Sequence, residues 1–181
     1  MNIKEGRPWL IIGGARSGKS ALGERLAVAS GLSLHYVATA LPGDEEMAAR
    51  IAAHRARRGA GWTTHGAATG ICGTLDNHGG AGTVMVIDCL TLWLSNLMEA
   101  GCDLETETGM LVEALGRAQG VVILISGEVG GGIVPGNALG RAFRDAHGLL
   151  NQRIALAADT VVLVTAGLPQ VLKSNGRPVH G

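Results

Sequence analysis

The sequence predicts a doubly wound α/β fold with a mainly parallel sheet, in a single domain that spans residues 1–181. Short, nearly continuous apolar runs recur along the chain, as parallel strands covered on both faces require. Segments with helical patterns separate these runs, as in repeated strand–helix–strand units. Apolar residues make up 46% of the chain and aromatic residues only 3%, which favours this class over an aromatic-rich β-sandwich.

The predicted elements follow from these patterns in chain order. The chain contains 29 glycines, and glycine-rich turns are expected between the elements. The segment 66–82 is too rich in glycine for a regular element, and we expect a loop that includes at most a single helical turn. Strands are expected at 9–14, 34–39, 83–88, 121–126 and 160–165, and helices at about 19–30, 44–58, 90–99, 104–118 and 137–157.

Charge and cysteine content exclude several classes of protein. Fifteen basic and fifteen acidic residues cancel, so no overall positive field attracts nucleic acid or anionic membrane. No apolar stretch approaches the roughly 20 residues that span a bilayer, and the first residues lack the order of a signal peptide. Cys72, Cys89 and Cys102 are odd in number and have no zinc-site spacing. A cytoplasmic protein without a disulfide framework is expected.

The stretch "GGARSGKS" at 13–20 matches the phosphate-binding pattern G-x-x-x-x-G-K-[ST], between an expected strand and an expected helix. Backbone N–H groups of such a loop surround a phosphate at the positive end of the helix. Lys19 is expected to reach the β and γ oxygens as a catalytic residue, and Ser20 to bind Mg²⁺. The alternative is a glycine-rich turn without a ligand. The predicted nucleotide-binding residues here are Gly13, Gly14, Ala15, Arg16, Ser17, Gly18, Lys19 and Ser20.

A nucleotide site with Mg²⁺ needs a carboxylate at the end of a neighbouring strand, and Asp88 ends the expected strand at 83–88. Asp88 alone is equally consistent with a simple helix cap. Together with Lys19 and Ser20, it is the better candidate for a metal ligand.

The expected helix at 44–58 carries a histidine beside arginines. Ile51 and His54 fall on one face at helical spacing, so His54 either packs or lines a cleft. A neutral imidazole beside guanidinium groups suits attack on a phosphorus atom. From these residues alone, a half-buried structural histidine is the more frequent case.

Six stretches in order resemble the bifunctional adenosylcobinamide kinase/adenosylcobinamide-phosphate guanylyltransferase family of cobalamin biosynthesis. The stretch at 128–159 is much more specific than a phosphate loop. The matching residues are "GGARSGKS" (13–20), "YVATA" (36–40), "DEEMAARIAAHRARR" (44–58), "DCLTLWLSNL" (88–97), "EVGGGIVPGNALGRAFRDAHGLLNQRIALAAD" (128–159) and "GLPQVLK" (167–173).

The resemblance implies a RecA-like P-loop fold, commonly assembled as a homotrimer, that performs two reactions. ATP or GTP phosphorylates a hydroxyl of adenosylcobinamide, and GTP then donates GMP to that phosphate through a covalent GMP-histidine. The family's nucleophile lies in an Arg-Ile-x-x-His segment, which here ends at His54. The further nucleotide contacts that the resemblance implies are Ala38, Thr39, Ala40, Arg55, Ala56, Arg57, Arg58, Gly66 and Asp88.

The chain departs from the family pattern at two glycines. Gly66 stands where the family usually has Glu, which places a nucleoside contact and the base selectivity in question. Gly127 stands where the family has Asn, before the retained Glu128. The loop that follows is either a substrate-side or interface loop or a structural turn. Arg141, Arg144 and Asp145 either face the corrinoid or belong to a helix of core or subunit contacts, and we rank the second interpretation first.

Two other functions are consistent with the phosphate-binding motif. A P-loop kinase of another small molecule would leave His54 structural and form no covalent nucleotide. A nucleotide-gated switch protein would hydrolyse slowly and bind a partner protein, but the chain has no strong block of like charge for this purpose.

Overall fold

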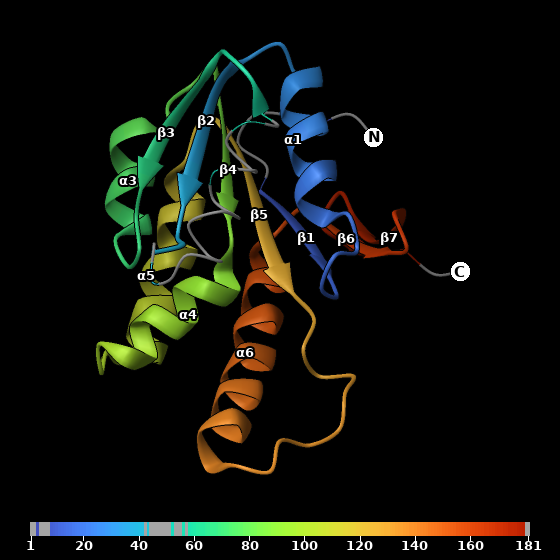
Figure 1. Cartoon of the computed structure of the whole chain (residues 1–181). Coiled ribbons are helices and arrows are strands. Elements are labelled where there is room, and N and C mark those ends of the chain that lie inside the picture. The colour runs from blue at the N-terminus through green and yellow to red at the C-terminus, as the bar shows by residue number, and fades with distance from the viewer. Residues whose placement is uncertain are drawn as a thin grey trace.

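A single eight-stranded sheet forms the centre of the protein in the computed structural model, which describes residues 3, 8–41, 43, 52, 56 and 58–179 (Figure 1). The strand order is β3-β2-β4-β5-β1-β6-β7-β8. Neighbouring strands from β3 to β6 in this order pair in parallel, β7 pairs antiparallel with β6, and β8 pairs antiparallel with β7. The strands are β1 (Trp9–Gly13), β2 (Ser33–Ala38), β3 (Trp62–Gly66), β4 (Thr83–Asp88), β5 (Val121–Gly127), β6 (Thr160–Thr165), β7 (Leu168–Ser174) and β8 (Arg177–Pro178).

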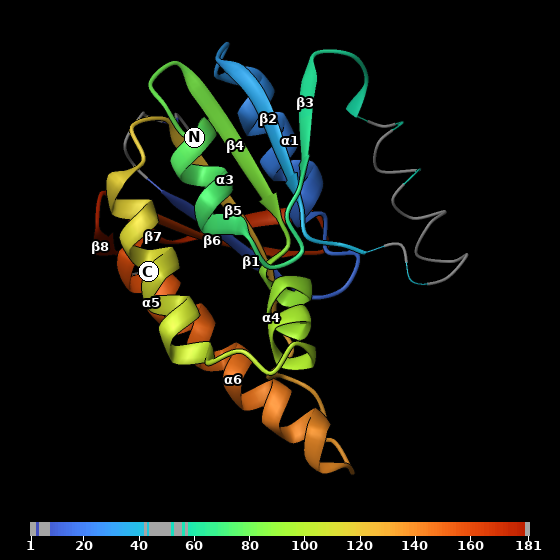
Figure 2. The same ribbon diagram turned by 90° about the vertical axis from the view of Figure 1, so that its left-hand side faces the viewer.

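Helices cover both faces of the sheet, as Figure 2 shows with α1 on one face and α3, α4, α5 and α6 on the opposite face. Successive residues of β1 illustrate why: Leu10 packs with α3, α4, α5 and α6, whereas Trp9 and Ile11 pack on the side of α1. This alternation buries apolar side chains on both faces of the strand. The helices are α1 (Lys19–Ala29), α3 (Ile71–His78), α4 (Leu90–Glu99), α5 (Leu104–Arg117) and α6 (Ala138–Ala157).

The five predicted strands are confirmed to within one residue at either end, and so are four of the five predicted helices. Capping explains two of the helix starts: Asp103 accepts a hydrogen bond from the Thr106 N–H before α5, and Asn137 accepts one from the Gly140 N–H before α6. The fifth predicted helix, at 44–58, lies mostly outside the described residues.

The predicted loop at 66–82 is wrong. Its middle forms the eight-residue helix α3, because Ile71 and Leu75, one helical turn apart, are both buried in the core. Two further parts of the sheet were not expected. The edge strand β3 has mostly exposed residues, and β7 and β8 form a hairpin whose residues are exposed or half-buried. Neither presents the continuous apolar run of a central strand.

Helix α6 divides its apolar residues between the core and the surface. Leu150 and Ile154 are buried in the core, and Phe143 packs against the same cluster. Leu139 is 71% exposed, so it does not belong to the core of this chain. Arg144 and Arg141 donate hydrogen bonds to carbonyls of the preceding loop, at Gly130 and Pro135 respectively.

Candidate nucleotide site

The turn between β1 and α1 forms a cradle at the carboxyl end of the sheet. Residues 14–16 are exposed there, with Arg16 at φ 55° and Gly18 at φ 97° turning the chain into the helix. Gly18 is the N-cap of α1 and makes no side-chain cap bond, so the first N–H groups of the helix face outward. Free N–H groups and the positive end of the helix dipole suit an anion such as a phosphate.

Close packing holds the base of this cradle. A Cβ atom on Gly13 would come within 2.5 Å of the Val164 carbonyl oxygen and 2.6 Å of Ser17 Oγ, so the backbone can approach only with glycine here. The Gly167 N–H donates to the Ser17 carbonyl over 2.9 Å, which ties the cradle to the turn after β6. Ser17 Oγ is buried and has no hydrogen-bond partner among the described residues. An unpaired hydroxyl in the cradle fits a bound phosphate oxygen.

The predicted catalytic residue Lys19 and the predicted Mg²⁺ ligand Ser20 are the first two residues of α1. Lys19 Nζ donates to the Gly14 carbonyl over 3.1 Å, so the ammonium group lies across the cradle. Ser20 is half-buried in the first turn of the helix. The structure therefore places the predicted residues 13–20 in one turn, with the Lys19 ammonium group across it.

Asp88 ends β4 at the same edge of the sheet and is held by a neighbouring strand. The Tyr36 hydroxyl of β2 donates to Asp88 Oδ2 over 3.0 Å. Burial, together with the Asp88 carboxylate, raises the pKa of the Tyr36 phenol well above its ordinary range, so the phenol stays protonated and keeps donating. Asp88 is therefore an oriented carboxylate rather than a helix cap: the N-cap of α4 is Cys89.

Arg58, predicted to contact the nucleotide, stacks on the same tyrosine. Its guanidinium carbon lies 3.5 Å from the centroid of the Tyr36 ring, and Trp62 meets that ring edge-on at 6.1 Å between centroids. A cation over an aromatic face is an attractive arrangement. Ala56 is exposed. The other predicted residues of this segment, His54, Arg55 and Arg57, lie outside the described residues.

The predicted contacts at 38–40 lie beside Asp88, but the polar groups of Thr39 are used within the protein. Thr39 Oγ1 accepts from the Cys89 N–H over 2.7 Å and donates to the Cys89 carbonyl over 2.8 Å. The Thr39 carbonyl accepts from Asn96 Nδ2. Thr39 thus fixes the turn after β4. The part of this segment that is accessible to a ligand is therefore formed by the half-exposed Ala38 and Ala40.

Gly66 lies at the same edge, paired with Ala38 across β2 and β3. A Cβ atom there would meet nothing within 4 Å, so the position has room for a larger side chain. Its nucleoside contact stays a prediction.

Sequence reasoning missed two polar clusters. His147, 1% exposed on α6, lies among Thr91, Ser126 and Asn151. The only sequence signal for it is the helical spacing of His147 and Asn151 in an apolar stretch.

The second missed cluster is formed by His35, His65 and His78, which come from β2, β3 and α3. Their ring centroids lie 4.3–6.1 Å apart in a stack. No group of three His, Cys, Asp or Glu residues in the described part of the chain is arranged to hold a metal ion.

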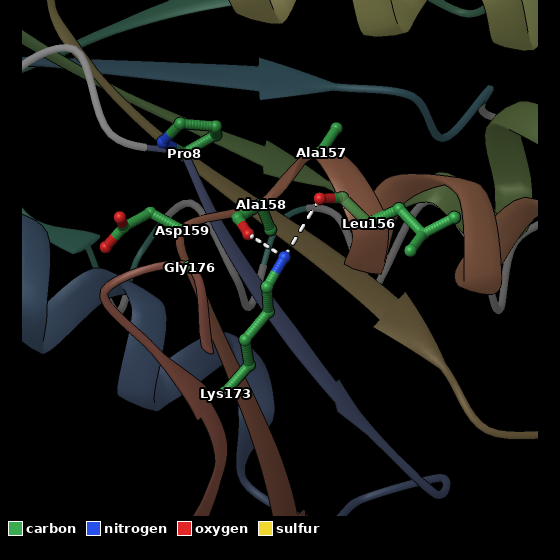
Figure 3. A pocket seen from close by; sticks show the side chains of 7 residues that line it. All are labelled: Pro8, Leu156, Ala157, Ala158, Asp159, Lys173 and Gly176. Atoms are coloured by element: carbon green, nitrogen blue, oxygen red, sulfur yellow. Dashed lines mark hydrogen bonds between the residues drawn. The ribbon is translucent and has the colours of Figure 1, made fainter. Parts of the chain in front are cut away.

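A shallow hollow of about 310 Å³ lies at the opposite, amino end of the strands (Figure 3). Pro8, Asp159 and Lys173 are among its lining residues. Lys173 Nζ donates to three carbonyls at the end of α6, those of Ala155, Leu156 and Ala158, over 2.6–2.9 Å. Its charge is used to cap the helix, so this hollow is a structural feature and not the site of the chemistry.

A glycine-rich cradle before a helix, with a carboxylate on a strand two positions along a parallel sheet, defines a P-loop nucleotide-binding α/β protein. Solved structures agree with the fold of this class. A KaiC-like protein of Pyrococcus horikoshii matches with a TM-score of 0.52 and 14% sequence identity, over 89% of this chain and 72% of that one. The flagellar accessory protein FlaH of Methanocaldococcus jannaschii matches with the same score and identity, over 96% and 80%. These likenesses confirm the predicted RecA-like fold.

The sequence comparisons identify the family. A family model described as cobinamide kinase / cobinamide phosphate guanyltransferase matches residues 9–172. The bifunctional adenosylcobalamin biosynthesis protein CobP of Pseudomonas aeruginosa is 48% identical over 174 residues, which cover 94% of this chain and 98% of that protein. CobU of Salmonella typhimurium is 36% identical over 179 residues, with 91% and 98% covered. The chain belongs to the cobinamide kinase / cobinamide phosphate guanyltransferase family.

The chain is thus a bifunctional transferase that uses nucleoside triphosphates and cobinamide substrates, as the resemblance in its sequence implied. Within the described residues, the structure contains no helix with the length and apolar character needed to cross a membrane.

Proposed function

We propose that this protein phosphorylates adenosylcobinamide with ATP or GTP, and then transfers GMP from GTP to the product, giving adenosylcobinamide-GDP and pyrophosphate. The observation that carries the proposal is the cradle at 13–20, with its unpaired buried Ser17 hydroxyl, on the same sheet edge as an oriented Asp88. Both reactions need a site that holds a triphosphate and compensates the charge that develops on it.

The residues at this edge of the sheet have different proposed roles. The cradle N–H groups hold the phosphates, and Lys19 stabilises the charge that develops on the β and γ oxygens. Ser20 and Asp88 are the residues that would bind Mg²⁺, a hard cation that prefers hydroxyl, carboxylate and phosphate oxygens. Such an ion would neutralise charge on the phosphates when bound. Tyr36 keeps the Asp88 carboxylate directed through its hydrogen bond.

His54 is proposed as the nucleophile that forms a covalent GMP-histidine. A two-step transfer at the α-phosphorus lets one pocket release pyrophosphate before the anionic acceptor arrives. The position of Arg58, four residues after His54, supports this role because Arg58 stacks on Tyr36, whose hydroxyl contacts Asp88. Arg55 and Arg57 would then neutralise phosphate charge in the same step.

Nucleoside contacts are proposed at Ala38, Ala40 and Gly66, at the carboxyl ends of β2 and β3, where Ala38 pairs with Gly66. A homotrimer is proposed from the family resemblance, and a cytoplasmic location from the cysteines. Cys72, Cys89 and Cys102 are all free thiols, which suits a reducing compartment.

A variant of Lys19 tests the shared triphosphate site. Lys19→Ala should lower both the phosphorylation of adenosylcobinamide and the guanylyl transfer by about 10²-fold or more, because both lose charge stabilisation. The matched control is Arg25→Ala on the exposed side of α1, which removes a cation without touching the cradle. Transfer of label from γ-labelled ATP and from α-labelled GTP measures the two activities. Unchanged phosphorylation in Lys19→Ala would overturn the proposed site.

A further inference from the structure

The carboxyl end of β5 lies between the two halves of the nucleotide site. The sheet order places β5 between β4, which ends at Asp88, and β1, which leads into the cradle. Gly127, the last residue of β5, pairs with Gly13, and the Glu128 N–H donates to the Gly13 carbonyl over 3.0 Å. The chain that leaves β5 therefore starts beside the cradle, before it loops out toward α6 (Figure 1). A side chain at this point starts at the sheet edge where the proposed site would hold the phosphates.

Glu128 is the first side chain available there. Gly127 has none, and a Cβ atom on it would come within 2.8 Å of Thr91 Oγ1. Glu128 is exposed, and its Oε1 accepts from the Gly130 N–H over 2.6 Å, which orients the carboxylate within its own turn. Arg144 of α6 donates to the Gly130 carbonyl and holds the other side of this turn.

Two helices hold the backbone that precedes Glu128. The Gly127 N–H donates to Thr91 Oγ1 of α4 over 2.7 Å, and the Gly127 carbonyl accepts from Asn151 Nδ2 of α6 over 3.0 Å. Ser126 Oγ donates to Asn151 Oδ1 over 2.7 Å and fixes the orientation of that amide. Both polar backbone groups of Gly127 are thus bound by side chains, which fixes the end of the strand.

The buried His147 completes this network. Its Nε2 lies 3.1 Å from Thr91 Oγ1 and 3.3 Å from Ser126 Oγ, and its Nδ1 lies 3.4 Å from Asn151 Nδ2. Because the Asn151 amide nitrogen only donates, Nδ1 must be the acceptor, and the ring proton belongs on Nε2, where it is donated to the hydroxyls. Burial lowers the pKa of His147, against the opposing effect of the Glu128 carboxylate. A neutral ring matches this pattern, whereas a protonated Nδ1 would face another donor.

We propose that Glu128 is the general base of the phosphoryl-transfer step, and that His147 is a positioning residue that fixes it through Thr91, Asn151 and Gly127. The substrate hydroxyl oxygen bonds to the γ-phosphorus, its proton passes to the Glu128 carboxylate, and the bond from the γ-phosphorus to the bridging oxygen breaks to release the nucleoside diphosphate. The proton then leaves to solvent. Guanylylation of the enzyme needs no such base, because a neutral imidazole attacks there. This assignment rests on the phosphate site proposed above.

Glu128→Gln tests the base. The substitution keeps the size and one acceptor oxygen for Gly130 but removes the negative charge and with it the ability to take up a proton. We expect the kcat of cobinamide phosphorylation to fall by about 10²–10⁴-fold, the usual contribution of a general base, with the KM for ATP little changed. Covalent labelling by α-labelled GTP should continue. Glu113→Gln, an exposed residue of α5, is the matched control. Lys19→Ala, in contrast, is expected to lose both activities, so failure of the phosphate site and failure of the base are distinguishable.

Three outcomes would overturn the role of Glu128. Phosphorylation that is unchanged in Glu128→Gln excludes a base at this position. Equal loss of phosphorylation and of covalent labelling would indicate a general defect of the nucleotide site. Recovery of the lost rate at high Mg²⁺ concentration would make Glu128 a metal ligand instead of a base.

Two variants of His147 test the positioning role. His147→Leu removes the imidazole contacts to Thr91 and Asn151 and leaves these two side chains only their remaining bonds to β5. We expect the kcat of phosphorylation to fall on the order of tenfold or more while labelling by GTP is kept, as for a small misplacement of a catalytic group. His147→Gln, whose amide can still donate toward Thr91, should restore most of that rate. Equal activity of His147→Leu and wild type, or parallel loss of phosphorylation and labelling, would overturn the role.

The pH profile of phosphorylation separates positioning from mere packing. Glu128 is the charged group that faces His147 from the loop after β5, and α4 and β5 present only the hydroxyls of Thr91 and Ser126. Protonation of Nδ1 as the pH falls below the ordinary histidine range should turn the Asn151 amide and release the Gly127 carbonyl. Wild-type kcat should then decline more steeply in acid than that of His147→Gln. Identical acid limbs for both proteins would contradict this mechanism.

Discussion

Replacing Gly13 by alanine tests how tightly the cradle is closed against the sheet. The added Cβ atom would lie 2.5 Å from the Val164 carbonyl oxygen, whereas ordinary contacts to a Cβ atom begin at 3.4 Å. Ser17 Oγ, at 2.6 Å, can rotate away, but the Val164 carbonyl belongs to the backbone of β6 and cannot move alone. Relief therefore requires about an ångström of separation between β1 and β6, with a typical overpacking cost of about 1–3 kcal/mol.

For a chain of this size, that cost corresponds to a fall in Tm of about 2–12 °C, which thermal unfolding followed by circular dichroism measures. The comparison variant is Gly14→Ala, where a Cβ atom meets nothing within 4 Å and φ is not positive, so its Tm should stay within about 2 °C of wild type. Displacement of the cradle should also abolish the rise in Tm on adding GTP to Gly13→Ala. Equal Tm values for the two variants would refute the close approach of Gly13 to β6.

The stacked histidines predict a pH dependence of stability. Burial and the neighbouring His78 lower the pKa values of His35 and His65 below the ordinary 6.5, so the unfolded chain takes up protons first and the free energy of unfolding falls as the pH drops below about 6.5. Urea unfolding at pH 7.5 and 5.5 should show that the free energy of unfolding decreases in wild type and decreases less in His65→Gln. Equal decreases in the two proteins would refute the role of the stacked histidines. The open position of Gly66 predicts that Gly66→Glu is folded and discriminates GTP from ATP more sharply than wild type, measured as the ratio of kcat/KM values; an unchanged ratio would argue against a nucleoside contact there.

The central strands of the fold could be predicted because they are buried on both faces, and burial on both faces produces the continuous apolar runs at 83–88 and 121–126. The same reasoning fails where tertiary contacts determine whether a segment forms a helix or a strand. Helix α3 depends on two buried residues among glycine and polar residues. The β7 strand exists because it pairs with the edge of β6, and its sequence carries little apolar pattern of its own.

The candidate site shows the same division. A contiguous motif such as 13–20 could be predicted because the residues that form the cradle are neighbours in the sequence. Contacts made across the sheet could not: the hydrogen bond from Tyr36 to Asp88 joins residues 52 positions apart, and His147 lies 56 positions from Thr91. Likewise, Thr39 stabilises the turn after β4 through two hydrogen bonds to the backbone of Cys89, a residue distant in the sequence.

The proposed covalent intermediate would separate this enzyme from a simple P-loop kinase, and labelling with α-labelled GTP tests it most directly. If His54 carries GMP, label should remain on the protein through denaturation, survive alkali and be released by mild acid, because protonation of the P–N nitrogen makes it a good leaving group. His54→Ala should abolish the label and the guanylyl transfer while phosphorylation of adenosylcobinamide continues. Full labelling of His54→Ala, with loss of label in His65→Ala instead, would contradict the assignment of the nucleophile.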